Sequence, residues 1–166
     1  MLRFFAFYDL SYQAYKKGMK RFLDTEMKCH KNMDTQEIQR LRQVFIGAVN
    51  LTNSVFGDKA FIRFDSREAG GQWRRAVNVA LKDVILCGFA MRLNQRGQII
   101  RKSDSIRESL IHLLVHDEQF ISSIDQHTSD EDRVKYRFET WLNELDEILA
   151  DADNQAPKHT LSLIHI

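Results

Sequence analysis

The sequence predicts an all-α fold, an irregular bundle of about five to seven helices around one buried central helix. Three observations predict it. Proline occurs once and glycine 7 times in 166 residues, so few positions interrupt a helix. Hydrophobic residues make up 43% of the chain and charged residues 28%, as is typical of a globular domain with a packed core. Apolar residues also recur at helical spacing in several long segments.

The first part of the chain contains three predicted helices. The short apolar segment Leu2–Tyr8 is expected to be the end of a helix. Residues 16–30 carry apolar side chains at helical spacing. The clearest helix follows Asp34, because Asp34 and Glu37 have the spacing of a capping box, and Gly57 is a good C-terminal stop.

The central helix is expected over residues 76–93, which are apolar on nearly every side. A helix of this kind is normally buried. The preceding residues interrupt the helical pattern, and 65–71 are expected to form a polar loop. Residues 94–102 are expected to be a basic connector.

Three further patterns complete the predicted bundle. Ser105 and Glu108 have capping-box spacing and predict the start of a helix. Residues 117–124 predict a short helix or turn. Thr128 and Glu131 have the same capping-box spacing and predict the start of the last helix.

Residues 1–150 are therefore expected to form the helical part, followed by a polar linker over 151–160. The last six residues, 161–166, read Leu-Ser-Leu-Ile-His-Ile and are unlike the linker. They are also the translation of CTGTCTCTTATACACATC, the mosaic end of a transposon used to prepare sequencing libraries. We therefore expect this tail to be adapter sequence, with a native C-terminal strand as the alternative.

The net charge of +1 conceals an asymmetry along the chain. Residues 1–110 carry 20 Lys and Arg against 11 Asp and Glu, whereas residues 111–166 carry 4 against 12. This pattern favours either contact with nucleic acid or two oppositely charged parts that attract each other. Phosphate contact would need basic side chains on one face. The candidates flank the central helix and are Arg74, Arg75, Arg92, Arg96, Arg101 and Lys102.

We predict no catalytic, cofactor-binding or metal-binding residue in this chain. His112 and His116 are spaced to share a helix face with Glu108, but the segment lacks the glutamate of the H-E-x-x-H motif. Cys29 and His30 are neighbours and would point in different directions on a helix, so they are poorly placed to act as a catalytic pair.

The two cysteines, Cys29 and Cys87, are expected to be small buried side chains in a reducing compartment. The chain shows neither a signal peptide nor an apolar run of the ~18 residues that a membrane span requires. We therefore expect a cytoplasmic protein that makes no contact with a membrane.

Several segments together resemble one protein family. They are LRFFAFY at Leu2–Tyr8, KRFLD at Lys20–Asp24, VFGDKAF at Val55–Phe61, VNVAL at Val77–Leu81, and the spaced residues Phe120, Ile124, Thr128, Val134, Arg137 and Phe138. The family is the GmrSD-type restriction endonuclease N-terminal domain family, long catalogued as a domain of unknown function. The Val55–Phe61 segment is the most specific of these matches.

The resemblance implies that the chain is a fragment, the helical portion of a larger α/β plus helical protein. In the family, a ParB-like α/β half with an Asp-Gly-Gln-Gln-Arg-Leu type motif would precede Met1, and an HNH nuclease domain often follows. The parent would be a prokaryotic defence protein that cleaves foreign or modified DNA, using a nucleoside triphosphate and a divalent metal. None of the family's catalytic residues falls on this chain, so we expect a scaffold that contacts the DNA backbone through its basic residues.

The alternative is a helical protein-interaction module with no nucleic-acid role, in which the acidic helix over residues 130–150 would be the docking surface. A truncated start also predicts exposed apolar surface at the N-terminal end, since Leu2, Phe4, Phe5 and Phe7 would have lost a packing partner.

Overall fold

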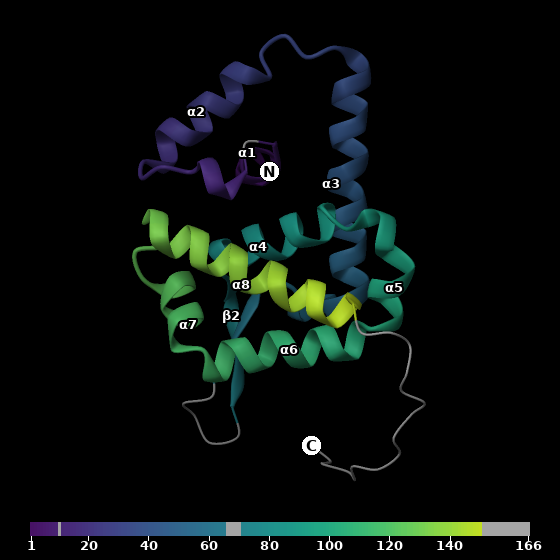
Figure 1. Ribbon diagram of the computed structural model, residues 1–166, viewed down its shortest axis with the longest axis vertical. Coiled ribbons are helices and arrows are strands. Elements are labelled where there is room, and N and C mark those ends of the chain that lie inside the picture. Colours follow the sequence, from purple (N-terminus) through teal and green to yellow (C-terminus); the bar gives the residue numbers. More distant parts are fainter. Residues whose placement is uncertain (10, 66–70, 151–166) are drawn as a thin grey trace.

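The computed structural model describes residues 1–9, 11–65 and 71–150. Over these ranges the chain forms eight α-helices, three short 3₁₀-helices and one two-stranded antiparallel sheet (Figure 1). The helices are α1 (Leu2–Asp9), α2 (Met19–Cys29), α3 (Thr35–Phe56), α4 (Val79–Ala90), α5 (Arg96–Arg101), α6 (Ser103–His116), α7 (Glu118–Asp125) and α8 (Glu131–Ala150), and the strands are β1 (Ile62–Asp65) and β2 (Gln72–Val77). The predicted helical fold class is confirmed, with one helix more than expected. The expected linker and adapter tail lie outside the described residues.

Helix α4 is the centre of the bundle, as predicted. Ten of its 12 residues are buried, and α1, α3, α7 and α8 pack against it. Figure 1 shows α8 crossing in front of α4. The helix begins later than expected, because Asn78 Oδ1 accepts a 2.9 Å hydrogen bond from the Leu81 N–H and so caps the helix, leaving Ala76 and Val77 in β2.

The two strands pair on either side of the expected polar loop, and neither of them was predicted from the sequence. Phe64 and Trp73 face each other across the two strands, with ring centroids 5.3 Å apart. Gly71 has a positive φ of 66°, and a Cβ at this position would collide with the Phe64 ring. Glycine therefore lets β2 start directly against its partner strand.

Local capping interactions set several helix ends as the sequence predicts. Asp34 Oδ1 accepts a 2.8 Å hydrogen bond from the Glu37 N–H at the start of α3, and Gly57 caps its end with a φ of 53°. Asp117, for which no cap was predicted, caps α7 in the same way through the Phe120 N–H. The other two predicted caps are wrong, because Ser105 lies inside α6, and Thr128 lies three residues before the start of α8.

The predicted basic connector over residues 94–102 is also wrong. This segment begins within a 3₁₀-helix (Leu93–Gln95) and continues as α5. Ile99 of α5 is fully buried, which gives the segment an inner face despite its basic residues.

A buried ionic cluster joins the N-terminal helix to the centre of the bundle. Arg3 Nε donates to Asp83 Oδ2 at 3.0 Å, and the Asp83 side chain is only 1% exposed. Arg137 of α8 is fully buried and donates to the carbonyls of Ser123 and Thr128 at 3.1 and 2.8 Å. Burial raises the pKa of Asp83, against the effect of Arg3, and lowers the pKa of Arg137 to about 10.

The expected apolar surface at the N-terminal end is present in part. Phe4 and Phe7 are buried, and the Phe7 ring lies 5.0 Å from that of Phe138. Leu2 is 37% exposed and Phe5 is half-buried. Among the described residues, no helix is both long and apolar enough to span a bilayer.

Candidate functional site

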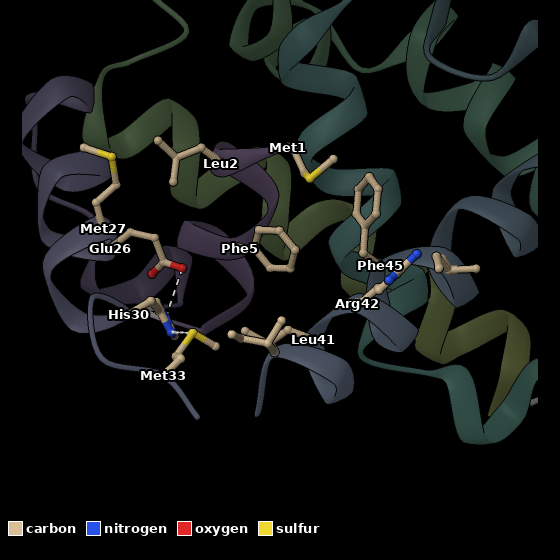
Figure 2. Close-up of a pocket in the computed structure, with 12 residues that line it drawn as sticks. Met1, Leu2, Phe5, Glu26, Met27, His30, Met33, Leu41, Arg42 and Phe45 are labelled. Carbon is tan, nitrogen blue, oxygen red and sulfur yellow. Dashed lines mark hydrogen bonds and ion pairs between the residues drawn. The ribbon is translucent and has the colours of Figure 1, made fainter. Parts of the chain in front are cut away.

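Helices α1, α2 and α3 enclose an apolar groove with a volume of about 590 Å³, here called the α1–α3 groove (Figure 2). Nine of its twelve lining residues are apolar. They are Met1, Leu2, Phe5, Met27, Met33, Ile38, Leu41, Phe45 and Ile46. The three polar residues that complete the lining are Glu26, His30 and Arg42.

The groove gathers the exposed apolar side chains of the molecule. Ten large hydrophobic side chains are exposed among the described residues, and five of them line this groove. Met1, Met27 and Ile38 are exposed by 75, 53 and 50%. Scattered exposed hydrophobic residues are ordinary, whereas a contiguous apolar patch is typical of a surface that binds a partner.

The arrangement of the helices explains why these side chains stay exposed. Residues 34–40, which are the N-cap and the first six residues of α3, are all exposed, and Leu41 is the first buried residue of the helix. Figure 1 shows α3 rising beyond the bundle toward the loop that joins it to α2. Helix α2 is held on the other side by Phe22, whose ring lies 5.2 Å from Phe7 and 5.1 Å from Tyr15.

One wall of the groove carries a cluster of two carboxylates and a histidine, here called the Asp9–Glu26–His30 cluster. His30 Nε2 lies 3.1 Å from Glu26 Oε1 and 3.2 Å from Asp9 Oδ2. The other ring nitrogen, Nδ1, lies 2.8 Å from Met33 Sδ. Figure 2 shows Glu26, His30 and Met33 side by side at the edge of the apolar lining.

Burial dominates the electrostatics of this cluster. Glu26 is only 2% exposed, and its burial raises its pKa, with a smaller contribution in the same direction from Asp9. Burial also raises the pKa of Asp9. His30 opposes the increase in both carboxyls, because a protonated imidazole beside them favours their ionised forms.

No family model, curated protein or solved structure matches this chain. The groove, the cluster and the residues that carry the family resemblance are therefore the features that indicate a function.

One of the six predicted phosphate-contacting residues lies in the interior and not on the surface. Arg92 is buried, and its guanidinium donates to Asp146 Oδ1 at 2.8 Å and to the carbonyls of Gly88 and Leu142 at 3.2 and 3.0 Å. Arg92 therefore joins α4 to α8 and is a correction to the predicted set.

The other five residues of that set lie on β2 or at α5 and its C-terminal end. Lys102 Nζ donates to the Ile148 carbonyl at 2.7 Å, and Arg74 Nε donates to Asp65 Oδ2 at 3.0 Å. Arg75, Arg96 and Arg101 are exposed.

The attraction between oppositely charged parts of the chain is visible as ion pairs. Lys16 and Lys17 reach the start of the acidic C-terminal segment at Glu131 and Asp130, at 2.6 and 3.0 Å. Arg92 pairs with Asp146 near the other end of α8. These contacts support the second interpretation of the charge asymmetry, in which the basic and acidic parts meet within the molecule.

The histidine and cysteine candidates lie elsewhere. His112 and His116 are exposed on α6 with ring centroids 4.8 Å apart. Cys87 is buried as predicted, and burial raises the pKa of its thiol well above the usual value. The prediction for Cys29 is wrong, because it lies on the exposed face of α2.

Sequence reasoning missed the Asp9–Glu26–His30 cluster. Within the described residues, it is the one group of three or more metal-ligating side chains whose ligand atoms converge. The spacing of Glu26 and His30, four residues apart at the end of α2, was the available signal. Asp9 gave no signal, since only the packing of α1 against α2 brings it to His30.

Proposed function

We propose that this chain is a non-catalytic helical scaffold that holds a neighbouring part of its parent protein in the α1–α3 groove. The parent would be a cytoplasmic prokaryotic defence protein of the nucleotide-dependent type that cleaves modified DNA. The observation that carries the proposal is the gathering of five exposed hydrophobic side chains in one groove. The segments that resemble the GmrSD-type family support the nature of the parent.

The apolar lining favours a protein partner over a nucleic acid. Phosphate contacts require cations, and Arg42 is the one basic residue in the lining. Covering a half-exposed hydrophobic side chain contributes on the order of 1 kcal/mol. Five such side chains in one place can therefore hold a protein surface.

The proposed occupant is the ParB-like α/β half that the resemblance places before Met1. Met1 itself lines the groove, so an α/β part joined there would start beside it. A short tether raises the effective concentration of the attached part to the millimolar range, so a modest apolar contact is enough to keep it docked. Nucleotide, divalent metal and DNA cleavage would belong to other parts of the parent.

The two earlier interpretations fit the described residues less well. Arg92 and Lys102 donate to groups on α8, and Arg74, although exposed, is paired with Asp65. The other exposed members of the predicted DNA-contacting set are Arg75, Arg96 and Arg101. Helix α8 buries its apolar face in the core, so the groove is a better protein-docking surface than this acidic helix.

The proposal is tested with two matched substitutions on α3. Ile46 lines the groove and Val49 does not, and both are 39% exposed. We expect Ile46→Lys to weaken binding of the separately expressed α/β part by at least about tenfold, since a lysine ammonium would be desolvated against apolar side chains. Val49→Lys should bind as the unchanged chain does.

Isothermal titration calorimetry measures both affinities, and far-UV circular dichroism checks that each variant folds. Equal loss in the two variants, or full binding by Ile46→Lys, would contradict docking in the groove. A parent gene with no α/β part carrying the Asp-Gly-Gln-Gln-Arg type motif would contradict the choice of occupant.

A further inference from the structure

The polar wall of the α1–α3 groove has the features of a cation site. Asp9, Glu26 and His30 each contribute one ligand atom, and these atoms all lie within 4.8 Å of one another. Asp9 comes from the end of α1, Glu26 from α2, and His30 from the residue that caps the end of α2. A shared ion would therefore connect two helices that form the groove.

The two distances from His30 to the carboxylates are close to those between neighbouring ligands of a tetrahedral metal ion. Bonds of about 2.0–2.1 Å to nitrogen and oxygen place adjacent ligand atoms roughly 3.3 Å apart around Zn²⁺. His30 Nε2 lies 3.1 and 3.2 Å from the two carboxylate oxygens. An ion could enter with small side-chain movements.

The orientation of the His30 ring supports coordination through Nε2. Nδ1 lies 2.8 Å from Met33 Sδ, so the neutral ring can donate its Nδ1–H to the thioether sulfur, a weak acceptor. The Nε2 lone pair then points at the two carboxylates. Metal-binding histidines are commonly fixed by a contact at the second ring nitrogen in this manner.

A buried oxygen of Glu26 lacks a partner. Glu26 is 2% exposed, and its Oε2 has no hydrogen-bond partner among the residues that the structure describes. A buried carboxylate oxygen without a partner is costly. A cation bound between Glu26 and Asp9 would offset that cost, and it would also reverse the effect of burial, which raises the pKa of both carboxyls.

We propose that Asp9, Glu26 and His30 bind one divalent transition-metal ion, with Zn²⁺ as the ion that the ligand set favours. Two carboxylates and one imidazole suit Zn²⁺ better than Ca²⁺ or Mg²⁺, which prefer oxygen ligands alone. Three protein ligands leave a fourth position for water or for a donor from a docked partner, because Glu26 and His30 both line the groove. This proposal does not depend on the identity of the groove's occupant.

The test is a titration of the full chain, stripped with a chelator, with ZnCl₂ near neutral pH. We expect one ion per chain and a higher melting temperature with zinc present, because binding the folded state stabilises it. His30→Gln and Asp9→Asn should each lower the affinity by more than about 100-fold, since losing even a supporting contact of a metal ligand costs 10–100-fold. The control is the double variant His112→Gln with His116→Gln, which removes the exposed histidine pair on α6 and should bind zinc unchanged.

Substitution with Co²⁺ identifies the ligands. The visible absorption of the cobalt form should have the intensity of a four-coordinate site, and it should be lost in His30→Gln. If that variant fails to fold, Asp9→Asn, at the end of α1, provides the same test. Either an absence of saturable zinc binding, or binding that depends on His112 and His116 and survives His30→Gln, would overturn the proposal. Neither result would change the difference between Ile46→Lys and Val49→Lys in affinity for the α/β part. The metal-site proposal and the docking proposal can therefore be contradicted independently.

Discussion

Glu26 is a carboxylate in an unusual environment for a helix that lies on the surface of the bundle. Its side chain is 2% exposed, while Met27, Lys28 and Cys29 next to it are exposed. Burial raises its pKa above the ordinary value of 4.5, Asp9 adds to the increase, and His30 opposes it. The folded state therefore binds a proton at Glu26 more tightly than the unfolded state does.

This difference predicts how stability depends on pH. For a carboxyl whose pKa is raised by folding, the contribution to stability is largest at low pH and is lost as the pH rises from 4.5 through the folded pKa. We expect Glu26→Gln, in metal-free protein, to remove the part of the pH dependence of stability that comes from Glu26. The free energy of unfolding, measured with urea over this pH range, should therefore fall less steeply than in the unchanged chain.

The control for this prediction is Glu139→Gln, which changes an exposed carboxylate of α8. Its stability should follow that of the unchanged chain across the pH range. Parallel curves for Glu26→Gln and the unchanged chain would show that folding does not raise the pKa of Glu26.

Individual residues differ in how well their roles could be predicted from the sequence. Asp34 and Asp117 cap their helices through amides three residues away, so a local pattern is enough to identify them. The pairing of Asp9 with His30 spans 21 positions and depends on the packing of α1 against α2. The sequence around Arg92 predicts an exposed cation. Arg92 is buried because α8 packs over it, which the local sequence does not indicate.

At the scale of elements, the close approach of α4 and α8 depends on Gly88. A Cβ at this position would lie 2.8 Å from Trp141 Nε1 and 3.0 Å from Leu145 Cδ1. Both neighbours are fully buried side chains of α8 and have little room to move. Glycine at this position thus permits the close contact between α4 and α8.

We predict that Gly88→Ala destabilises the chain by about 1–3 kcal/mol, the usual range for overpacking a core. Gly97→Ala is the matched control, because a Cβ there would meet only the end of Arg101 at 3.6 Å. In helix α5 that change should stabilise by about 0.4–1 kcal/mol. Urea denaturation measures both, and a Gly88→Ala variant as stable as the unchanged chain would contradict the close packing of the two helices.

The helices were easier to predict than their boundaries or the strands. Apolar side chains at helical spacing identified α3 and α4, because each buries a continuous face. The hairpin was missed since β1 has four residues and its pairing with β2 is irregular between Ile62 and Phe64. Helix α6 starts at Ser103, directly after α5, so the capping pattern at Ser105 had no role there.

The whole molecule combines a closed core with one open apolar groove. The core is built from α4 and the helices around it, and ion pairs between α8 and the basic first part of the chain support it. The groove lies where α2 and the start of α3 extend from this core. Composition predicted the core, whereas the groove could not be predicted, because the periodic apolar residues of 16–30 and α3 looked like ordinary core positions.

Hydrogen–deuterium exchange of the chain, with and without the α/β part of its parent, tests the central claim most directly. Docking in the groove predicts slower exchange of backbone amides in α1, in the C-terminal half of α2 and over residues 35–46 of α3, with no change in α5 or α6. Slower exchange confined to α8 would instead identify the acidic helix as the docking surface. That result, or unchanged exchange throughout α1–α3 in the presence of the α/β part, would contradict the proposed function.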